Sequence, residues 1–391
     1  MQLSNFLSRI PITISKKFKS IITILFILFI SFNFYSQNKY VFVGSYNFNK
    51  DKKGIYVFKV DTVTGKLKKI TTVKNVLNPS YLTVSPNGNY IYACTDTKTP
   101  NAGSVSSFEF KPQNKTLTFI NSQKSGGENP VYLSVHKNGK WLVNANYTEG
   151  SVAVHSLTED GKISPIVQVL SYSEGSINKE RQDRSHVHSS VFSPNYDFIF
   201  LPDLGADKIR SYQFDSLQKQ PLQETPFPFT QAVLGSGPRH FVFHPNGKFA
   251  YCVEELTGTV SAYKYSNGKL DSFQRITAHS DEFKEGFNSG DIHVSPDGLF
   301  LYVSNRGEEN NIAIFSIEND GILKTVGCQS TYGRTPRIFA VDSQGKFIIV
   351  ANQSTGNVVV FKRDSVTGLL KKCSTNTKVK NASCVQIKEY L

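Results

Sequence analysis

Cysteine is scarce in this chain of 391 residues, and its distribution excludes several classes of protein. There are five cysteines, an odd number, and no two of them have the spacing of a metal-binding pair or of a disulfide framework. Cys94 and Cys252 fall inside apolar strand patterns, where a buried thiol behaves as a small hydrophobic side chain. We therefore expect neither a cysteine-stapled scaffold nor a catalytic cysteine.

Acidic residues are also in deficit, because 31 Asp and Glu face 44 Lys and Arg, which gives a formal net charge of +13. Many of the basic residues are scattered as pairs near expected turns, such as Lys68-Lys69 and Lys371-Lys372. Scattered pairs are typical of a solvated surface and not of a nucleic-acid interface. The excess of positive charge favours anionic small molecules as partners.

Long apolar runs are absent apart from one at 21–34, which follows the basic stretch 16–19. This order is typical of a secretory signal peptide, and the run is shorter than the roughly 20 residues of a membrane-spanning helix. We expect a signal peptide at 1–36 that exports a domain at 38–391 to the periplasm or the cell exterior. An uncleaved N-terminal anchor is the alternative, because Phe34 is a poor residue three positions before a cleavage point.

A turn sequence recurs along the chain, at intervals of 51, 57, 51, 51 and 47 residues. Each copy stands between two short apolar strands, and Asn-Gly or Asp-Gly at such a place indicates a β-hairpin. The copies are SPNG (85–88), HKNG (136–139), SPNY (193–196), HPNG (244–247), SPDG (295–298) and DSQG (342–345).

A third strand follows each hairpin, and a fourth strand such as KLKKITTV (66–73) completes the unit. Four antiparallel strands in each of seven units predict an all-β protein, a seven-bladed β-propeller. Segment 39–46 aligns with the second strand of the other units, and 381–387 aligns with the first. We therefore expect the C-terminal strand to complete the N-terminal blade and close the ring, which leaves no open sheet edge. The third strands are 54–60, 103–110, 150–157, 207–214, 258–265, 310–317 and 356–363.

The innermost strands of a propeller line its channel, so equivalent residues of each unit form rings. Because the start of one strand and the end of its antiparallel neighbour lie at the same end of a blade, two such rings should face one mouth of the channel. The first ring, from the third residue of each first strand, is Ser80, Val131, His188, Arg239, Asp291, Arg337 and Ser383. The second ring, from the end of each second strand, is Tyr46, Asp96, Tyr147, Leu204, Glu255, Arg306 and Gln353.

These rings gather a histidine, three arginines and several carboxylates at one mouth. Guanidinium groups bind carboxylate or phosphate oxygens and can stabilise an oxyanion, and an imidazole suits general base catalysis. One alternative is a plug of mutually neutralising Arg and Asp side chains. Another is a zinc site, since His186 and His188 share a strand face and Glu255, Asp291 or His293 could complete the ligand set. We favour a site without a metal or other cofactor.

The remaining histidines and one long loop fall outside these rings. His136, His155, His240 and His244 are expected to be satisfied turn or strand-surface residues. The loop 173–188 is longer and more charged than the other loops between units. It either covers the mouth or forms a solvated insertion.

Taken together, several motifs resemble the lactonase family of seven-bladed β-propellers, of the 6-phosphogluconolactonase type, over about 40–390. The family's site lies at the channel mouth and contains a His, an Arg and a Glu, which correspond here to His188, Arg239 and Glu255. Asp291, Arg306, Arg337 and Gln353 also match family positions, and Tyr46 and His186 complete the expected substrate-binding set. The motifs are VGSY (43–46), NPSYLTVSPNG (78–88), HVHSSVFSP (186–194), PDLGADKI (202–209), GPRHFVFHPNGKFAYCVEEL (237–256), DIHVSPDGLFLYVSNRG (291–307) and TPRIFAVDSQGKFIIVANQ (335–353).

The resemblance implies hydrolysis of a sugar lactone to the aldonic acid. We expect a monomer, because propellers often work alone and nothing in the sequence demands an oligomer. His188 or Glu255 would take a proton from water, one arginine would face the oxyanion, and the others would bind phosphate or hydroxyl groups. The alternative is a non-catalytic exported propeller that binds anionic carbohydrate or a protein. Because 6-phosphogluconolactone is a cytoplasmic metabolite and this chain carries an export signal, the phosphorylation of the substrate stays open.

Overall fold

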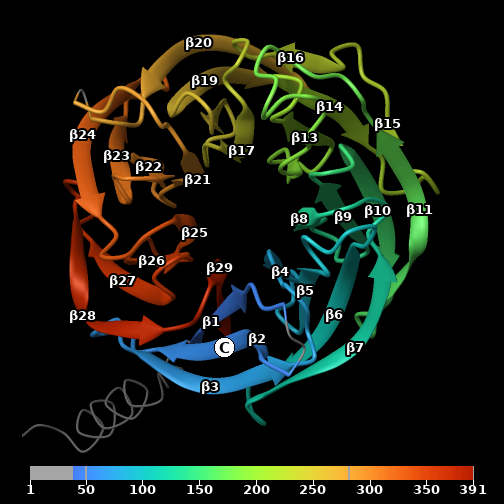
Figure 1. Cartoon of the computed structure of the whole chain (residues 1–391), viewed down its shortest axis with the longest axis vertical. Helices are drawn as coiled ribbons and strands as arrows, with labels where there is room; N and C mark the ends of the chain where they lie inside the picture. The colour runs from blue at the N-terminus through green and yellow to red at the C-terminus, as the bar shows by residue number, and fades with distance from the viewer. Residues whose placement is uncertain (1–37, 49–50, 281, 391) are drawn as a thin grey trace, which may run out of the picture. The chain divides into compact units, whose positions relative to one another are not determined.

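Every regular element of the described chain is a β-strand. The computed structural model describes residues 38–48, 51–280 and 282–390, and the predicted signal peptide at 1–36 lies outside them. Within the unit Asn38–Tyr390, seven antiparallel sheets surround a central axis, as Figure 1 shows. The predicted seven-bladed β-propeller is confirmed. Among the described residues, no helix is long and apolar enough to cross a membrane.

The blades follow one another along the chain, and each runs from the channel outward. Blade 1 contains β4 (Leu82–Val84), β5 (Tyr90–Thr95), β6 (Ser104–Lys111) and β7 (Thr116–Lys124). Blade 2 contains β8 (Pro130–Val135), β9 (Trp141–Asn146), β10 (Ser151–Leu157) and β11 (Ile163–Ser171). Blade 3 contains β12 (Val191–Phe192), β13 (Phe198–Asp203), β14 (Lys208–Phe214), β15 (Leu222–Gln223) and β16 (Phe229–Gln231).

The second half of the ring repeats this order with more regular sheets. Blade 4 contains β17 (Pro238–Phe243), β18 (Phe249–Glu254), β19 (Thr259–Ser266) and β20 (Lys269–Thr277). Blade 5 contains β21 (Ser289–Val294), β22 (Phe300–Asn305), β23 (Asn311–Ile317) and β24 (Leu323–Ser330), and blade 6 contains β25 (Pro336–Val341), β26 (Phe347–Asn352), β27 (Asn357–Arg363) and β28 (Leu370–Lys378). Blade 7 contains β29 (Ala382–Tyr390), β1 (Asn38–Ser45), β2 (Lys53–Val60) and β3 (Leu67–Lys74).

The second strand of each blade is apolar because neighbouring blades cover both of its faces. All six residues are buried in β18, in β22 and in β26. The outermost strands, such as β24, bury only alternate or isolated residues. The core therefore lies between blades, and it leaves only the innermost strand of each blade to face the channel.

Glycines in the outer hairpins allow adjacent blades to approach closely. Gly321 and Gly368 both have positive φ, and a Cβ on either would meet the ring of Phe249 or Phe300 in the preceding blade at 2.6 Å or 2.3 Å. The carbonyl oxygens of the same glycines accept hydrogen bonds from tyrosine hydroxyls of the preceding blade, at 2.9 and 2.8 Å. Only glycine fits these turns, because it tolerates a positive φ and has no Cβ to clash with the neighbouring ring.

Blade 3 departs from the four-stranded pattern at its outer edge. The segments β15 and β16 pair separately with β14, so its outermost strand is interrupted. Pro221, Pro226 and Pro228 stand in this segment, and proline has no backbone N–H to give to a sheet. Its innermost strand β12 is also short, and upstream of it an isolated bridge joins Val187 to Asp203.

The ring closes as predicted, because β29 pairs antiparallel with β1 along its whole length. This pairing puts the last strand of the chain at the channel and the N-terminal strands outside it, as Figure 1 shows. Lys39 on β1 pairs with the fully buried Asp342 of blade 6 and lies 3.0 Å from Glu389 on β29. A buried ion pair therefore joins blades 6 and 7 across the closure.

Candidate active site at the channel mouth

A β-bulge occupies the first-ring position in several innermost strands. In β8, β17, β25 and β29, one residue lies between two consecutive ladder pairs and has no partner opposite, and in β21 the irregularity covers Gly290 and Asp291. A bulge bends the strand and re-aims the side chain of the extra residue. The bulged residues are Val131, Arg239, Arg337 and Ser383.

Glu255 is the centre of a cluster of arginines at this mouth. Its Oε2 atom accepts from Arg239 Nε at 2.8 Å and lies 2.8 Å from Arg306 Nη2, and its Oε1 atom accepts from Arg181 Nη2 at 2.6 Å. The side chain of Glu255 is only 6% exposed and that of Arg239 is fully buried. The two rings therefore meet as predicted, and three guanidinium groups surround one carboxylate.

Two adjacent acids, the last residue of β18 and the one after it, have different partners. Glu254 is buried, and its carboxylate accepts from the hydroxyls of Thr259 and Ser261 and from Arg275 Nε, all in the same blade. Glu255 follows it and points into the channel. The alternation of side chains along a strand therefore gives one acid a structural contact and the other a place in the site.

The charges of this cluster shift the pKa values of its members. Burial opposes the ionisation of Glu255, but the charges of Arg306, Arg239 and Arg181 outweigh it and hold its pKa below the usual range. Burial and the neighbouring Arg306 lower the pKa of Arg239 to about 9, so it remains a cation at neutral pH. One carboxylate does not neutralise three guanidinium groups, so the mouth keeps a net positive charge and is not a neutral plug.

Several N–H groups of this cluster are available to donate hydrogen bonds to a ligand. Arg239 Nη2, Arg306 Nε and Arg337 Nε are buried and have no hydrogen-bond partner among the described residues. Buried donors are nearly always paired, because an unpaired one costs about 1–3 kcal/mol. Three donors from three arginines suit a ligand that is rich in oxygen acceptors.

His188 lies beside the arginines as a buried, neutral imidazole. Burial lowers its pKa well below the ordinary value, and the charges of Arg239 and Arg337 add to this effect. Its Nδ1 atom is buried and has no partner in the described part of the chain. The ring meets Tyr147 edge-on at 5.3 Å between centroids. A neutral imidazole can accept a proton at physiological pH.

His186 contacts the rim of the site and not its centre. Its ring stacks on Tyr147 at 4.4 Å, its Nδ1 lies 2.9 Å from the Tyr147 carbonyl oxygen, and its Nε2 lies 3.2 Å from Asp183 Oδ1. The alternative zinc site is not assembled, because the described residues contain no group of three His, Cys, Asp or Glu that could hold a metal ion. His186 instead orients Tyr147.

Tyr46 and Arg337 form the opposite side of the mouth. The Arg337 guanidinium lies 5.6 Å from the centre of the Tyr46 ring, and the Lys98 ammonium lies 5.1 Å from it. Burial and the charges of Arg337 and Arg306 lower the pKa of Lys98. Gln353 directly follows β26, in the next position of the ring, and is partly buried. Asp96 leaves the site, because its carboxylate accepts from Ser104 at the start of β6.

Asp291 does not join the arginines, and this corrects the sequence interpretation of two residues. Its Oδ1 atom lies 2.7 Å from His240 Nδ1, and its Oδ2 atom lies 2.9 Å from His293 Nε2. His240 is 3% exposed and lies in the channel, so the prediction of a satisfied turn or strand-surface residue was wrong. The β-bulge at Arg239 explains the error, because alternation along the strand fails there.

Arg181 is the site residue that the sequence did not single out. It belongs to the loop 173–188, which is tied down by the buried Gln182, whose Nε2 donates to the Leu204 carbonyl oxygen at 2.9 Å. Asn178 further closes the loop by accepting from the Arg181 backbone N–H at 3.2 Å. Of the two predictions for this loop, the structure supports the one in which it reaches over the mouth. Its unusual length and charge were the available signal.

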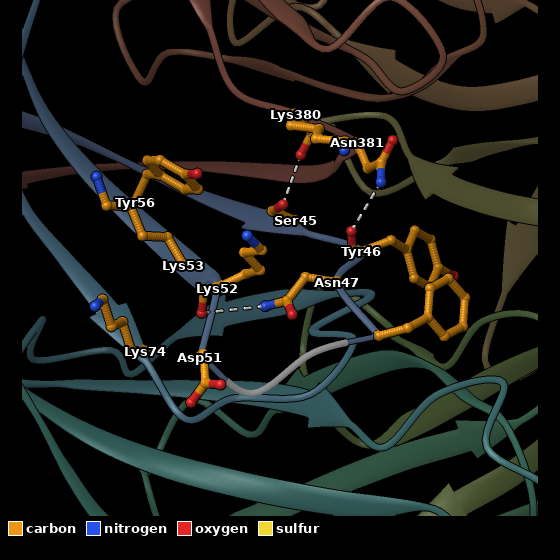
Figure 2. Close-up of a pocket in the computed structure, with 11 residues that line it drawn as sticks. Ser45, Tyr46, Asn47, Asp51, Lys52, Lys53, Tyr56, Lys74, Lys380 and Asn381 are labelled. Carbon is orange, nitrogen blue, oxygen red and sulfur yellow. Dashed lines mark hydrogen bonds between the residues drawn. The ribbon is translucent and has the colours of Figure 1, made fainter.

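A basic pocket adjoins Tyr46 on the outer side of the mouth, and Figure 2 shows its lining. The pocket measures about 620 Å³ and lies between the end of β1 and the start of β2. Lys53 and Lys74 are directly opposite each other on β2 and β3, although like charges in that arrangement repel. Lys52 and Lys380 also line the pocket, so it favours anions near the channel entrance.

Comparisons with known proteins agree with this geometry. The family model described as lactonase, 7-bladed beta-propeller, matches residues 40–387. The chain is 41% identical to a 6-phosphogluconolactonase of Formosa agariphila, over 90% of this chain and 99% of that protein, and 33% identical to one of Bacillus subtilis over the same shares. A periplasmic gluconolactonase of Pseudomonas aeruginosa superimposes with a TM-score of 0.83 at 33% identity, over 90% of this chain and 99% of that one. The chain therefore belongs to the lactonase family of seven-bladed β-propellers.

Proposed function

We propose that this protein hydrolyses the ester bond of a sugar lactone to give the aldonic acid at the channel mouth. The observation that carries the proposal is a neutral, buried imidazole beside an arginine cluster that has unpartnered N–H groups. Ester hydrolysis needs a base for water and donors for the oxyanion, and both are present within one opening. The names of its relatives, 6-phosphogluconolactonase and gluconolactonase, support lactones of gluconate as the substrate class.

The proposed reaction uses water as its only other reactant. His188 accepts a proton from water, the water oxygen forms a bond to the lactone carbonyl carbon, and the carbonyl oxygen becomes an oxyanion. Arg239 Nη2 donates to that oxyanion, and collapse of the intermediate breaks the bond to the ring oxygen. His188 then returns the proton to the ring oxygen, which leaves as a hydroxyl group of the aldonic acid.

Glu255 acts in this scheme as an anchor for the arginines. Because guanidinium groups contact both of its oxygen atoms, its role is to hold them and not to take a proton from water. Its carboxylate fixes Arg239 and Arg306, which leaves their remaining N–H groups directed at the ligand. Arg306, Arg337 and Tyr46 would then bind the hydroxyl or phosphate groups of the substrate.

Acid release from glucono-δ-lactone and from its 6-phosphate tests the proposal. The wild-type protein should accelerate hydrolysis of at least one of them above the spontaneous rate, and His188→Ala should lower kcat by about 10²- to 10⁴-fold. Glu255→Gln should lower kcat/KM because the arginines lose their anchor. Failure of the wild-type protein to accelerate hydrolysis of any sugar lactone would refute the assignment.

The basic pocket favours a second candidate, in which the propeller binds anionic carbohydrate without catalysis. Lys53, Lys74 and the neighbouring aromatic Tyr56 line a cavity large enough for a sugar ring or two. This candidate predicts saturable binding of oligo-uronates by a protein that leaves lactones unchanged. Calorimetry with a charged and a neutral oligosaccharide of equal length separates the two functions.

We also infer that the N-terminal segment 1–36 directs export and that the mature protein works as a monomer. The basic and apolar pattern supports export, and the relative from Pseudomonas aeruginosa is named as periplasmic. An exported enzyme would meet unphosphorylated lactones more often than 6-phosphogluconolactone. Cell fractionation, followed by N-terminal sequencing and size-exclusion chromatography of the exported protein, tests these points.

A further inference from the structure

A second polar layer lies next to the arginine cluster, and the mechanism above does not use it. Asp291 is at its centre and is only 5% exposed. Its carboxylate contacts His240 Nδ1 at 2.7 Å and His293 Nε2 at 2.9 Å, and it also accepts from the Phe339 backbone N–H at 3.1 Å. Three blades contribute to this layer, since these residues belong to β17, β21 and β25.

The chemistry of a carboxylate assigns the hydrogen atoms of both histidines. An ionised carboxylate only accepts, so His240 Nδ1 and His293 Nε2 must each carry a hydrogen. Burial and the charge of Arg239 lower the pKa of His240 to about 4, so His240 is neutral at physiological pH. A neutral imidazole with its hydrogen on Nδ1 has a lone pair on Nε2.

His293 is the second imidazole on Asp291, and it is the one whose protonation Asp291 favours. Its side chain is 35% exposed, so water can reach it. Burial opposes its protonation, but the Asp291 charge outweighs this effect and raises its pKa. Burial likewise opposes the ionisation of Asp291, but His293 and His240 hold its pKa below the usual range. Asp291 therefore favours a proton on His293, while His240 stays neutral.

His240 and His188 are neighbouring rings, and each has one nitrogen atom without a hydrogen-bond partner among the described residues. Their ring centroids are 5.3 Å apart and the ring planes meet at 67°. His188 Nδ1 and His240 Nε2 are both buried, and neither has a partner among the residues that the structure describes. Joining the two atoms requires that the rings rotate and that His188 carries its hydrogen on Nδ1.

We propose that Asp291 and His240 are positioning residues that fix the tautomer of His188 for lactone hydrolysis. Asp291 holds the His240 hydrogen on Nδ1, His240 Nε2 accepts the Nδ1 hydrogen of His188, and His188 Nε2 is left with its lone pair. This inference rests on the proposed function, and it assigns the proton acceptor to a single atom. When His188 Nε2 takes the proton from water, the resulting cation is stabilised through Nδ1 by the Asp291–His240 pair.

We call the chain of contacts from Asp291 through His240 to His188 the relay, and the surroundings of His240 keep both of its imidazoles neutral over a wide pH range. Arg239 and Arg337 repel a proton on either imidazole, so kcat/KM should not fall near pH 6.5, where an ordinary imidazole gains its proton. Tyr81 and Tyr132 stay un-ionised, since burial raises the pKa of both. The ionisable groups that face His240 are Asp291 from β21, His188 from blade 3, Arg239 on its own strand, Arg337 from β25, Tyr81 from blade 1 and Tyr132 from β8.

The first test is spectroscopic and does not depend on activity. The chain has eight histidines, so ¹⁵N-imidazole labelling of the whole protein gives spectra that can be assigned with single substitutions. Between pH 6 and 8, we expect hydrogen on Nδ1 of both His240 and His188 and on Nε2 of His293. Hydrogen on Nε2 of His240 or of His188 would overturn the relay, whether or not the protein hydrolyses lactones.

The second test is kinetic and uses conservative variants. In His240→Gln, the amide can donate to Asp291 and accept from His188, so kcat should exceed that of His240→Leu by at least about tenfold. Asp291→Asn offers one donor where the carboxylate only accepted, so one imidazole must change its tautomer, and kcat should fall by about 10²- to 10⁴-fold. KM should change little, because neither residue belongs to the substrate-binding set of arginines.

Asp342→Asn is the matched control. Asp342 lies between β25 and β26, and its fully buried carboxylate pairs with Lys39 of β1. It should lower the melting temperature and leave kcat unchanged. Equal kcat values for His240→Gln and His240→Leu, or a wild-type kcat in folded Asp291→Asn, would overturn the relay while leaving lactone hydrolysis intact. A wild-type protein without lactonase activity would refute the proposed function and the relay's catalytic role together.

Discussion

Replacement of Arg181 by alanine tests whether the loop 173–188 belongs to the active site. Arg181 is the only one of the three arginines on Glu255 that comes from this loop, and its side chain is 41% exposed. The substitution removes a guanidinium group from Glu255 Oε1 while Arg239 and Arg306 stay on Oε2. The fold should survive, because Gln182 and not Arg181 anchors the loop.

The size of the effect follows from the contact at 2.6 Å and from its exposure. A hydrogen bond between two charged groups contributes about 1.5–3 kcal/mol when buried, and exposed ion pairs contribute about 0–1 kcal/mol. Arg181 lies between these limits, since its acceptor is buried and its own side chain is half-exposed. We expect a loss of about 1 kcal/mol, which corresponds to about a fivefold lower kcat/KM.

The assay compares a neutral and an anionic lactone. Glucono-δ-lactone and its 6-phosphate differ by one anionic phosphate group, so loss of one cation should raise KM more for the phosphate. Arg184→Ala is the matched control, because it removes the same charge from the same loop, and its guanidinium contacts Asp183 at 3.0 Å and not Glu255. An equal effect of both substitutions would show that only long-range charge matters. Unchanged kinetics in Arg181→Ala would exclude the loop from the site.

Three further outcomes follow from the described contacts. Lys39→Met should lower the free energy of unfolding by about 3–5 kcal/mol in urea titrations, because it leaves buried Asp342 without its ion-pair partner. The double variant Lys39→Met with Asp342→Leu should recover most of that loss. Stability should also decline as pH falls from about 6.5 to 4, because His240 has a pKa of about 4 in the folded protein and the unfolded chain therefore binds more protons in this window. His240→Gln should flatten the decline in melting temperature between pH 7 and 5. Lys53→Glu with Lys74→Glu should lower kcat/KM a few-fold for the 6-phosphate at low ionic strength and leave the neutral lactone unaffected, and an effect that persists in high salt would argue against steering by the basic pocket.

The fold was predictable because its strand signals repeat. Each hairpin carries a turn signal at nearly constant spacing, and the middle strands are mostly apolar because they are covered on both faces. The alignment of 39–46 and 381–387 with complementary strands was enough to predict how the ring closes. The interrupted edge of blade 3 was not foreseen, although Pro226 and Pro228 already argue against a continuous strand there.

Contacts within the site were predictable only where residues share a repeat position. Arg239, Glu255 and Arg306 occupy ring positions, and the structure joins them directly. Arg181 has no equivalent in the other blades, since it stands in a loop that interrupts the repeat. Its pairing with Glu255 depends on how that loop folds on itself through Asn178 and Gln182, and no periodic pattern encodes this.

The β-bulges explain both the success of the ring argument and its failure at His240. Without a bulge, alternation would put Arg239 and His240 on opposite faces of β17, and only one of them could face the channel. The bulge gives Arg239 no ladder partner, so its side chain turns to Glu255 while the buried His240 reaches Asp291 of the next blade. An arginine and an imidazole with different partners in the channel can thus occupy consecutive positions of one strand. Deleting the extra residue would force one of them out of the channel, so the bulge itself is a requirement of the chemistry proposed for this mouth.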